Sequence, residues 1–128
     1  MAGELILIVE DNENNRMLVR DVLQSRGYQT AETDTGEEGV RLAREQRPAL
    51  ILMDIQLPGM NGMEALKLLR ADAATRDIPV MAVTASAMTH DRQKIMAAGF
   101  DAYQTKPINV REFVEAVRTV IAARPGVK

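Results

Sequence analysis

The chain has 128 residues and a mass of 14.1 kDa, which is enough for one domain with its own core and leaves no room for a second. Cysteine is absent, which excludes disulfides and thiolate metal sites and suits a reducing compartment. The net charge of −2 and the lack of a basic run give no indication of a nucleic-acid or lipid partner. The apolar runs, of about five residues, are too short for a signal peptide or a membrane span. We therefore expect a cytoplasmic protein.

The first predicted element is a buried strand. Leu5 to Val9 is an unbroken apolar run, as in parallel strands covered on both faces, and the acidic segment Glu10-Asp11-Asn12 follows it. Between Asn15 and Arg26 apolar residues recur at helical spacing, which predicts a helix ended by Gly27. Its expected inward face comprises Leu18, Val19, Val22 and Leu23.

A more polar strand and a second helix come next. Tyr28 to Thr33 alternates loosely between apolar and polar residues, which predicts a strand at the edge of the sheet. Thr35-Gly36-Glu37-Glu38 has the form of a capping box and predicts a helix that runs to about Gln46, because Pro48 halts it.

The central strand leads into a single aspartate. The apolar run Ala49 to Met53 ends at Asp54, and a Pro58-Gly59 turn follows almost at once. Asn61, with Glu64 three residues later, predicts the start of a third helix. Its expected inner face comprises Met63, Leu66 and Leu69.

The last two strands show the same contrast between a buried strand and an edge strand. Val80 to Val83 is a third apolar run and ends at Thr84. A helix from His90 to Ala98 is expected next, and the alternating segment Phe100 to Thr105 then predicts a second edge strand that ends at Lys106-Pro107.

The final helix is predicted by the Asn109 cap with Glu112 and by one apolar face. That face comprises Val110, Phe113, Val114, Val117 and Ile121. Five strands then alternate with five helices, and three buried strands lie between two edge strands. The expected fold is a doubly wound α/β domain with a five-stranded parallel sheet in the order 2-1-3-4-5, of the flavodoxin-like kind.

In this topology every strand's carboxyl end opens on the same side of the sheet. The residues at these ends are Glu10, Asp11, Asp54, Thr84 and Lys106. Close carboxylates repel each other by about 4 kcal/mol per pair at an intermediate effective dielectric, so cations must lie among them. Lys106 supplies one, and Mg²⁺ is the natural second because carboxylates, waters and phosphate oxygens hold it.

A carboxylate beside a metal, a lysine and a hydroxyl is a competent nucleophile toward phosphorus, and it forms an acyl phosphate. Taken singly, each residue has a plainer interpretation: Asp54 as a turn starter, Thr84 as a helix cap, Lys106 as a surface lysine. Taken together at four strand ends, they indicate a site for phosphoryl transfer.

Four segments of the chain, in this order and spacing, resemble the receiver domain of bacterial two-component response regulators. They are Val9 to Asn12, Met53 to Gly62, Val83 to Ala85 and Lys106-Pro107, and the resemblance spans nearly the whole chain. It implies that Asp54 accepts the phosphoryl group and that Thr84 and Lys106 contact it. It also implies a Mg²⁺ site formed by Glu10, Asp11, Asp54 and the backbone carbonyl of Gln56.

The resemblance further implies a conformational switch. Thr84 would move toward the phosphoryl group, and the aromatic ring of Tyr103 would swing inward, although a tyrosine that merely packs on an edge strand is the plainer interpretation. The fourth helix, fifth strand and fifth helix would form the output face. Gln56 and Ser86 hold positions that in similar proteins tune the lifetime of the phosphoryl group.

On this basis we expect residues 1–128 to form a single receiver domain, with a core of about 4–123 and a short C-terminal tail. It would act as a stand-alone signalling switch, without turnover of other substrates, between a histidine kinase or phosphotransfer protein and a downstream protein. A receiver excised from a hybrid histidine kinase and a phosphorylation-independent scaffold remain alternatives.

Two other protein classes fit less well. A haloacid-dehalogenase-type phosphatase would carry a second aspartate two residues after its nucleophile on the first strand, whereas Gln56 fills that offset here on the third. A flavodoxin-like cofactor carrier needs a hydroxyl- and glycine-rich phosphate loop after the first strand. The acidic segment Glu10 to Glu13 would repel a phosphate instead.

Overall fold

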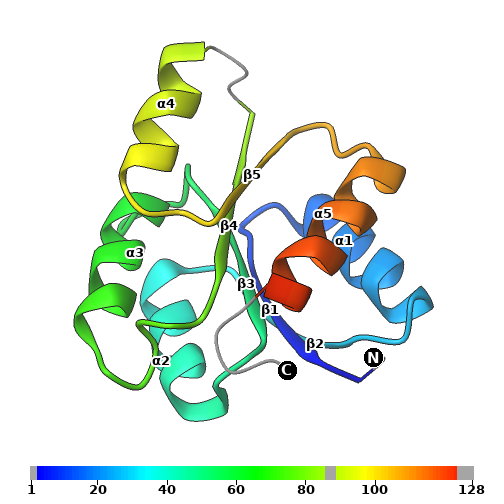
Figure 1. Cartoon of the computed structure of the whole chain (residues 1–128), viewed down its shortest axis with the longest axis horizontal. Helices are drawn as coiled ribbons and strands as arrows, with labels where there is room; N and C mark the ends of the chain where they lie inside the picture. Colours follow the sequence, from blue (N-terminus) through cyan, green and yellow to red (C-terminus); the bar gives the residue numbers. More distant parts are fainter. Residues whose placement is uncertain (1–2, 86–88, 124–128) are drawn as a thin grey trace.

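The computed structural model describes the backbone of residues 3–85 and 89–123. In this part of the chain five strands alternate with five helices, as the sequence predicts (Figure 1). The strands are β1 Leu5–Val9, β2 Gln29–Thr33, β3 Leu50–Asp54, β4 Val80–Thr84 and β5 Ala102–Thr105. The helices are α1 Glu13–Ser25, α2 Gly36–Gln46, α3 Gly62–Ala71, α4 Thr89–Ala97 and α5 Val110–Ala123.

All five described strands run parallel, in the order β2-β1-β3-β4-β5, which confirms the predicted topology. The register aligns the strand ends: Val9 lies beside Met53, and Asp54 beside Val83. Thr84 lies beside Thr105 on β5. The loops that carry the predicted site residues therefore start from one edge of the sheet.

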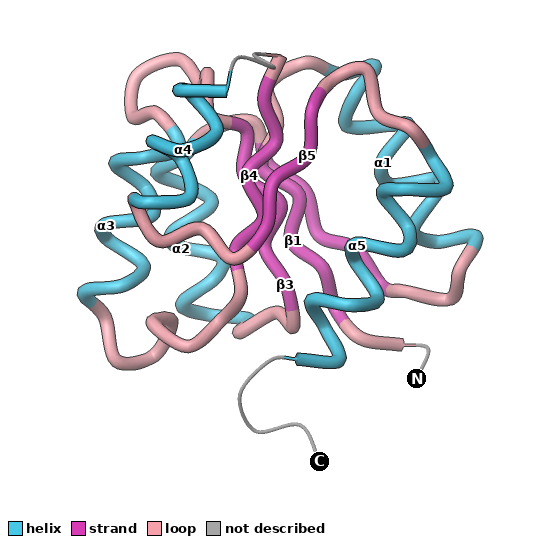
Figure 2. The backbone as a smooth tube through the Cα atoms, turned by 45° about the horizontal axis from the view of Figure 1, so that its top comes forward, coloured by secondary structure: helices cyan, strands magenta, loops and turns pink. Residues whose placement is uncertain are grey.

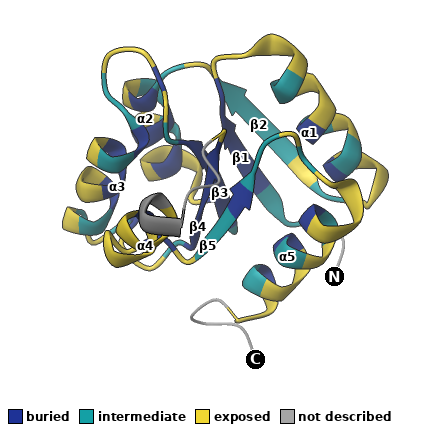
Figure 3. Ribbon diagram, turned by 90° about the horizontal axis from the view of Figure 1, so that it is seen from above, coloured by how far each residue is buried: buried dark blue, intermediate teal, exposed yellow. Residues whose placement is uncertain are grey.

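The helices cover both faces of the sheet, with α2, α3 and α4 on one side and α1 and α5 on the other (Figure 2). Successive strand residues alternate between these layers, so Ile51 packs toward α2 to α4 and Leu52 toward α1 and α5. The central strands are buried, whereas most of β2 and β5 is only partly covered (Figure 3). This confirms that β2 and β5 are the edge strands.

The helix starts follow their caps. Asn61 and Glu64 form a complete capping box, as predicted. At Thr35 only half of the predicted box forms: the Thr35 hydroxyl accepts from the Glu38 amide, but the Glu38 side chain pairs with Arg41. Helix α1 begins at Glu13, two residues before the predicted start, because the Asn12 side chain accepts from the amide nitrogen of Asn15 at 3.0 Å.

Two residues expected on inward faces are exposed. Leu18 is 42% exposed. Val19 and Leu23, one turn apart, face the sheet, and each residue turns the helix by about 100°, so Leu18 lies about 100° around the helix from Val19. Val110 is 40% exposed at the first position of α5, where Phe113 begins the buried stripe. No helix within residues 3–85 and 89–123 has the length and apolar character needed to cross a membrane.

Candidate functional site

Two carboxylates and one ammonium group meet at the carboxyl edge of the sheet. The Nζ atom of Lys106 lies 2.8 Å from Oε1 of Glu10 and 3.1 Å from Oδ2 of Asp54. Glu10 is only 4% exposed and Asp54 only 3%, so little water screens these charges. The structure thus brings together three of the residues that the sequence predicts at separate strand ends.

The backbone around Asp54 is tightly packed. Its Oδ1 accepts from the amide nitrogen of Gln56 at 2.9 Å, so the turn-starting role of an aspartate is present beside the ion pair. The start of α3 presses on the same turn, since a Cβ on Gly62 would lie 2.5 Å from the Asp54 carbonyl oxygen. The Asn61 cap is recognisable in the sequence, but the packing requirement at Gly62 is not, because it depends on the backbone of a neighbouring turn.

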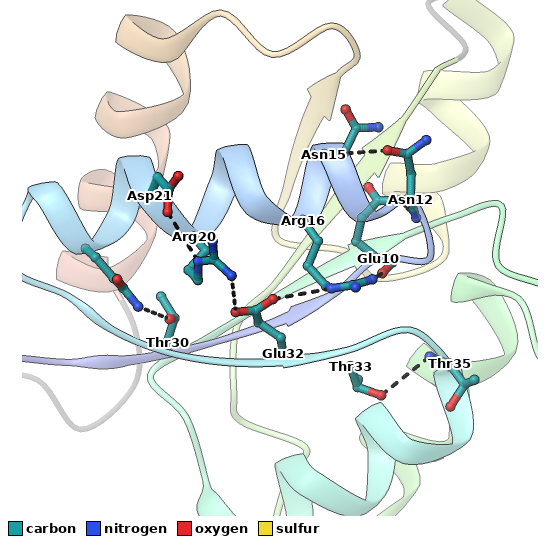
Figure 4. Close-up of polar contacts among 11 residues, drawn as sticks. Glu10, Asn12, Asn15, Arg16, Arg20, Asp21, Thr30, Glu32, Thr33 and Thr35 are labelled. Carbon is teal, nitrogen blue, oxygen red and sulfur yellow. Dashed lines mark hydrogen bonds and ion pairs between the residues drawn. The ribbon is translucent and has the colours of Figure 1, made fainter.

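Glu10 is held by its neighbours at both the side chain and the backbone. Its Oε2 accepts from the amide nitrogen of Asn12 at 3.1 Å, and its carbonyl oxygen accepts from the guanidinium group of Arg16 at 2.8 Å (Figure 4). Arg16 lies one turn into α1 and is not among the site residues predicted from the sequence. A hydrogen bond from a side chain to a backbone carbonyl corresponds to no recognisable sequence motif.

The charged groups of the site shift one another's pKa values. Burial, followed by the hydrogen bond with Asp54, raises the pKa of Glu10 to about 7, although Lys106 and the Asn12 amide act in the opposite direction. Burial also acts to raise the pKa of Asp54, but its hydrogen bonds with Glu10, the Gln56 amide and Lys106 hold that pKa below its usual value. Burial alone would lower the pKa of Lys106, and its two carboxylate neighbours raise it instead. Burial and the neighbouring carboxylate thus act against a negative charge on Glu10, whereas Lys106 favours the charged forms of both carboxyl groups.

A third carboxylate, that of the exposed Asp11, completes a group that fits a hard cation. Glu10, Asp11 and Asp54 each offer a ligand oxygen, and these atoms lie within 4.8 Å of one another. Three carboxylates against one nearby ammonium leave an excess of negative charge, and oxygen donors of this kind suit Mg²⁺. The role of the Gln56 backbone carbonyl as a further ligand stays a prediction.

The two predicted switch residues lie on neighbouring strands. Thr84 is 1% exposed at the end of β4, where its carbonyl accepts from the Lys106 amide at 2.8 Å. Tyr103 on β5 is half-buried and packs beside the core of the α2 to α4 side, with the Arg92 guanidinium 5.7 Å above its ring centre. The Lys106-Pro107 bond is cis. Ser86 lies outside the described residues.

Comparisons with known proteins agree with this geometry. Residues 6–118 match the response regulator receiver domain family. The polar-differentiation response regulator DivK of Brucella anthropi is 49% identical over 116 residues, which are 91% of this chain and 94% of that protein. DivK of Brucella ovis is 48% identical over the same shares.

Solved receiver structures have the same fold. One is the receiver domain of the sensor histidine kinase PA1611 from Pseudomonas aeruginosa PAO1, which has a magnesium ion coordinated in its active-site cleft. It is 36% identical to this chain with a TM-score of 0.88, and the match covers 95% of this chain and 100% of that one. The chemotaxis response regulator CheY4 of Vibrio cholerae is 25% identical with a TM-score of 0.87, covering 93% of this chain and 99% of that one. Together with the match over residues 6–118, these similarities identify the chain as a member of the response regulator receiver family.

Proposed function

We propose that this chain is a phosphorylation switch in which Asp54 accepts a phosphoryl group from a histidine kinase or a phosphotransfer protein. Phosphoryl acceptance is general for receivers, and the observation that supports Asp54 as the acceptor is its buried carboxylate, 3.1 Å from Lys106 and beside two further carboxylates. In its only reactions the chain would take up and lose its own phosphoryl group. The cytoplasmic location stays a prediction.

In the phosphorylation step, a carboxylate oxygen of Asp54 attacks the phosphorus of the donor. A new P–O bond forms as the P–N bond to the donor imidazole, or the P–O bond to acetate in acetyl phosphate, breaks and the leaving group keeps the electron pair. Bound Mg²⁺, held by Glu10, Asp11, Asp54 and the Gln56 carbonyl, would supply charge neutralisation for the phosphoryl oxygens. The Lys106 ammonium would pair with one of these oxygens in place of its present contact with Asp54.

The phosphoryl group adds negative charge and new acceptor oxygens at a packed site. Thr84 would donate its hydroxyl to one of these oxygens, and Tyr103 would move inward on the neighbouring strand. The surface of α4, β5 and α5 would then change and control a downstream protein. Gln56 and Ser86 would tune how long the phosphoryl group survives.

This switch is compatible with two kinds of protein: a stand-alone regulator and a larger kinase. The high identity with DivK, at 94% of that protein's length, favours a stand-alone regulator whose folded core spans residues 4–123. The 36% identity with the receiver of a sensor histidine kinase favours a receiver within a larger kinase as the second candidate.

The test is phosphorylation by acetyl phosphate in the presence of Mg²⁺, followed by mass measurement of the intact protein. We expect the wild-type chain to gain one phosphoryl group and Asp54→Asn to gain none. Asp77→Asn, at an exposed position, is the matched control and should be phosphorylated like the wild type. Modification of Asp54→Asn, or of the wild type after Mg²⁺ is removed with EDTA, would show that the assignment is wrong.

A further inference from the structure

Arg16 connects the acidic site to the edge strand β2 (Figure 4). Its Nη1 donates to the carbonyl oxygen of Glu10 at 2.8 Å, and its Nε lies 3.3 Å from Oε1 of Glu32. The second oxygen of Glu32 lies 3.4 Å from Nη1 of Arg20. The guanidinium group is therefore held from the side of β2 while it holds the loop after β1.

With Arg16 in place, each polar group of Glu10 has a partner. Its amide donates to the Thr33 carbonyl at 3.0 Å, and its two carboxylate oxygens contact Lys106 at 2.8 Å and the Asn12 amide at 3.1 Å. The Arg16 contact adds a charge-assisted hydrogen bond at the carbonyl, and such bonds are stronger than neutral ones. It fixes the plane of the peptide between Glu10 and Asp11, and therefore the direction in which each carboxylate leaves the backbone.

We propose that Arg16, supported by Glu32, is a positioning residue for the acidic pair and sets the affinity of the site for Mg²⁺. This inference rests on the proposed function, since it concerns the Mg²⁺ site of the same phosphorylation reaction. Groups that orient metal ligands typically change metal affinity or activity by about 10- to 100-fold when they are removed. Arg16 orients Glu10 and Asp11 through one backbone carbonyl.

Charge and positioning predict opposite effects, which makes the inference testable. A guanidinium group close to a cation site repels the cation, so removal of the charge alone would tighten Mg²⁺ binding. Removal of a group that orients the ligands would weaken Mg²⁺ binding. The direction of the change in Kd therefore distinguishes the two roles of Arg16.

The experiment is a calorimetric titration of the full chain with Mg²⁺, together with thermal unfolding. We expect Arg16→Met, which keeps the aliphatic stem and removes every donor, to raise the Kd for Mg²⁺ about tenfold. Arg41→Met is the matched control, because Arg41 also forms ion pairs with glutamates, in its case Glu38 and Glu45, but on the exposed side of α2. Its Kd should stay within about twofold of the wild-type value.

A second variant separates charge from geometry. Arg16→Lys keeps the positive charge but lacks the planar fork that reaches the Glu10 carbonyl and Glu32 together, so we expect a Kd about threefold above the wild type. This variant also carries the test if Arg16→Met does not fold. An unchanged or lower Kd in whichever Arg16 variant folds would overturn the positioning role. A wild-type chain that binds Mg²⁺ but is not phosphorylated would refute the proposed function alone, whereas one that binds no Mg²⁺ would refute both.

Discussion

The two ends of the sheet each carry a cluster of charged side chains, and the clusters differ in their charge balance. At the end opposite the site, Arg70 of α3 pairs with Asp101 at 2.7 Å and donates to the carbonyl oxygens of Arg76 at 2.9 Å and Ile78 at 2.7 Å. Asp101 also accepts from the amide nitrogen of Val80 at 2.8 Å. One cation thus meets one anion, and both have further partners in the backbone.

Among the described residues, the carboxyl end has three carboxylates near one ammonium group, that of Lys106. Lys106 offsets part of the repulsion, but burial, followed by the neighbouring Asp54, still raises the pKa of Glu10 to about 7. A balanced cluster joins secondary-structure elements and is complete in itself, whereas the unbalanced one has the excess negative charge that the proposed Mg²⁺ would offset. This contrast separates the structural ion pair from the candidate site more clearly than burial does.

The largest expected effect concerns the balanced cluster. We expect Arg70→Met to lower the free energy of unfolding by about 3 kcal/mol, because it removes the charged donor from the carbonyls of Arg76 and Ile78 and breaks the ion pair with Asp101. Urea denaturation measures this loss. Arg44→Met, which removes an exposed ion pair with Asp72, should cost less than about 1 kcal/mol. Equal losses in the two variants would contradict a structural role for Arg70.

The second prediction concerns the Mg²⁺ ion proposed for the unbalanced cluster. If Mg²⁺ completes the unbalanced cluster and binds only the folded chain, it should raise the free energy of unfolding by about 2.7 kcal/mol at a concentration 100 times its Kd. Urea denaturation with and without Mg²⁺ measures this gain. Arg70→Met should gain as much as the wild type, since its cluster lies at the other end of the sheet. A gain confined to the wild type would show that the two ends are not independent.

The third prediction removes one negative charge from the site. Without Mg²⁺, we expect Asp54→Asn to raise the free energy of unfolding by about 1 kcal/mol, because Glu10 can then ionise beside Lys106 without a second carboxylate next to it. Urea denaturation in EDTA measures the difference from the wild type. Asp77→Asn, at an exposed position, should leave stability unchanged. A destabilised Asp54→Asn variant would mean that the cluster is already balanced without a cation.

Much of this arrangement could be predicted from the sequence, because its signals are local. The runs Leu5 to Val9 and Ala49 to Met53 predicted buried strands, and parallel topology then placed Glu10, Asp54 and Lys106 at one edge. Periodicity was less reliable at helix ends. It placed Val110 inside, although the helix packs on the sheet only from Phe113 onward.

The parts that the sequence analysis missed depend on contacts between distant segments. In the sequence, Arg70 has the pattern of a surface residue on an amphipathic helix. Its partner Asp101 lies 31 residues later, so no local spacing indicates the pair. Arg16 acts on a carbonyl oxygen, and Gly62 is required by the carbonyl of Asp54. No residue type or spacing marks a backbone acceptor, so such contacts become visible only in the fold.

The smallest expected effect lies beside the site, where a cation contacts a ring instead of a carboxylate. The Arg92 guanidinium lies 5.7 Å above the ring centre of Tyr103, and such contacts contribute about 0.5 kcal/mol at exposed positions. Arg92→Met should lower the free energy of unfolding by about that amount. Tyr103 is expected to leave this contact when Asp54 is phosphorylated. Arg92→Met then destabilises only the unphosphorylated conformation, so it should shift the equilibrium toward the phosphorylated conformation by the same free energy. The NMR shifts of the Tyr103 ring, measured before and after beryllofluoride is added, report both populations. Ring shifts identical to those of the wild type in both states would show that Arg92 does not hold the ring.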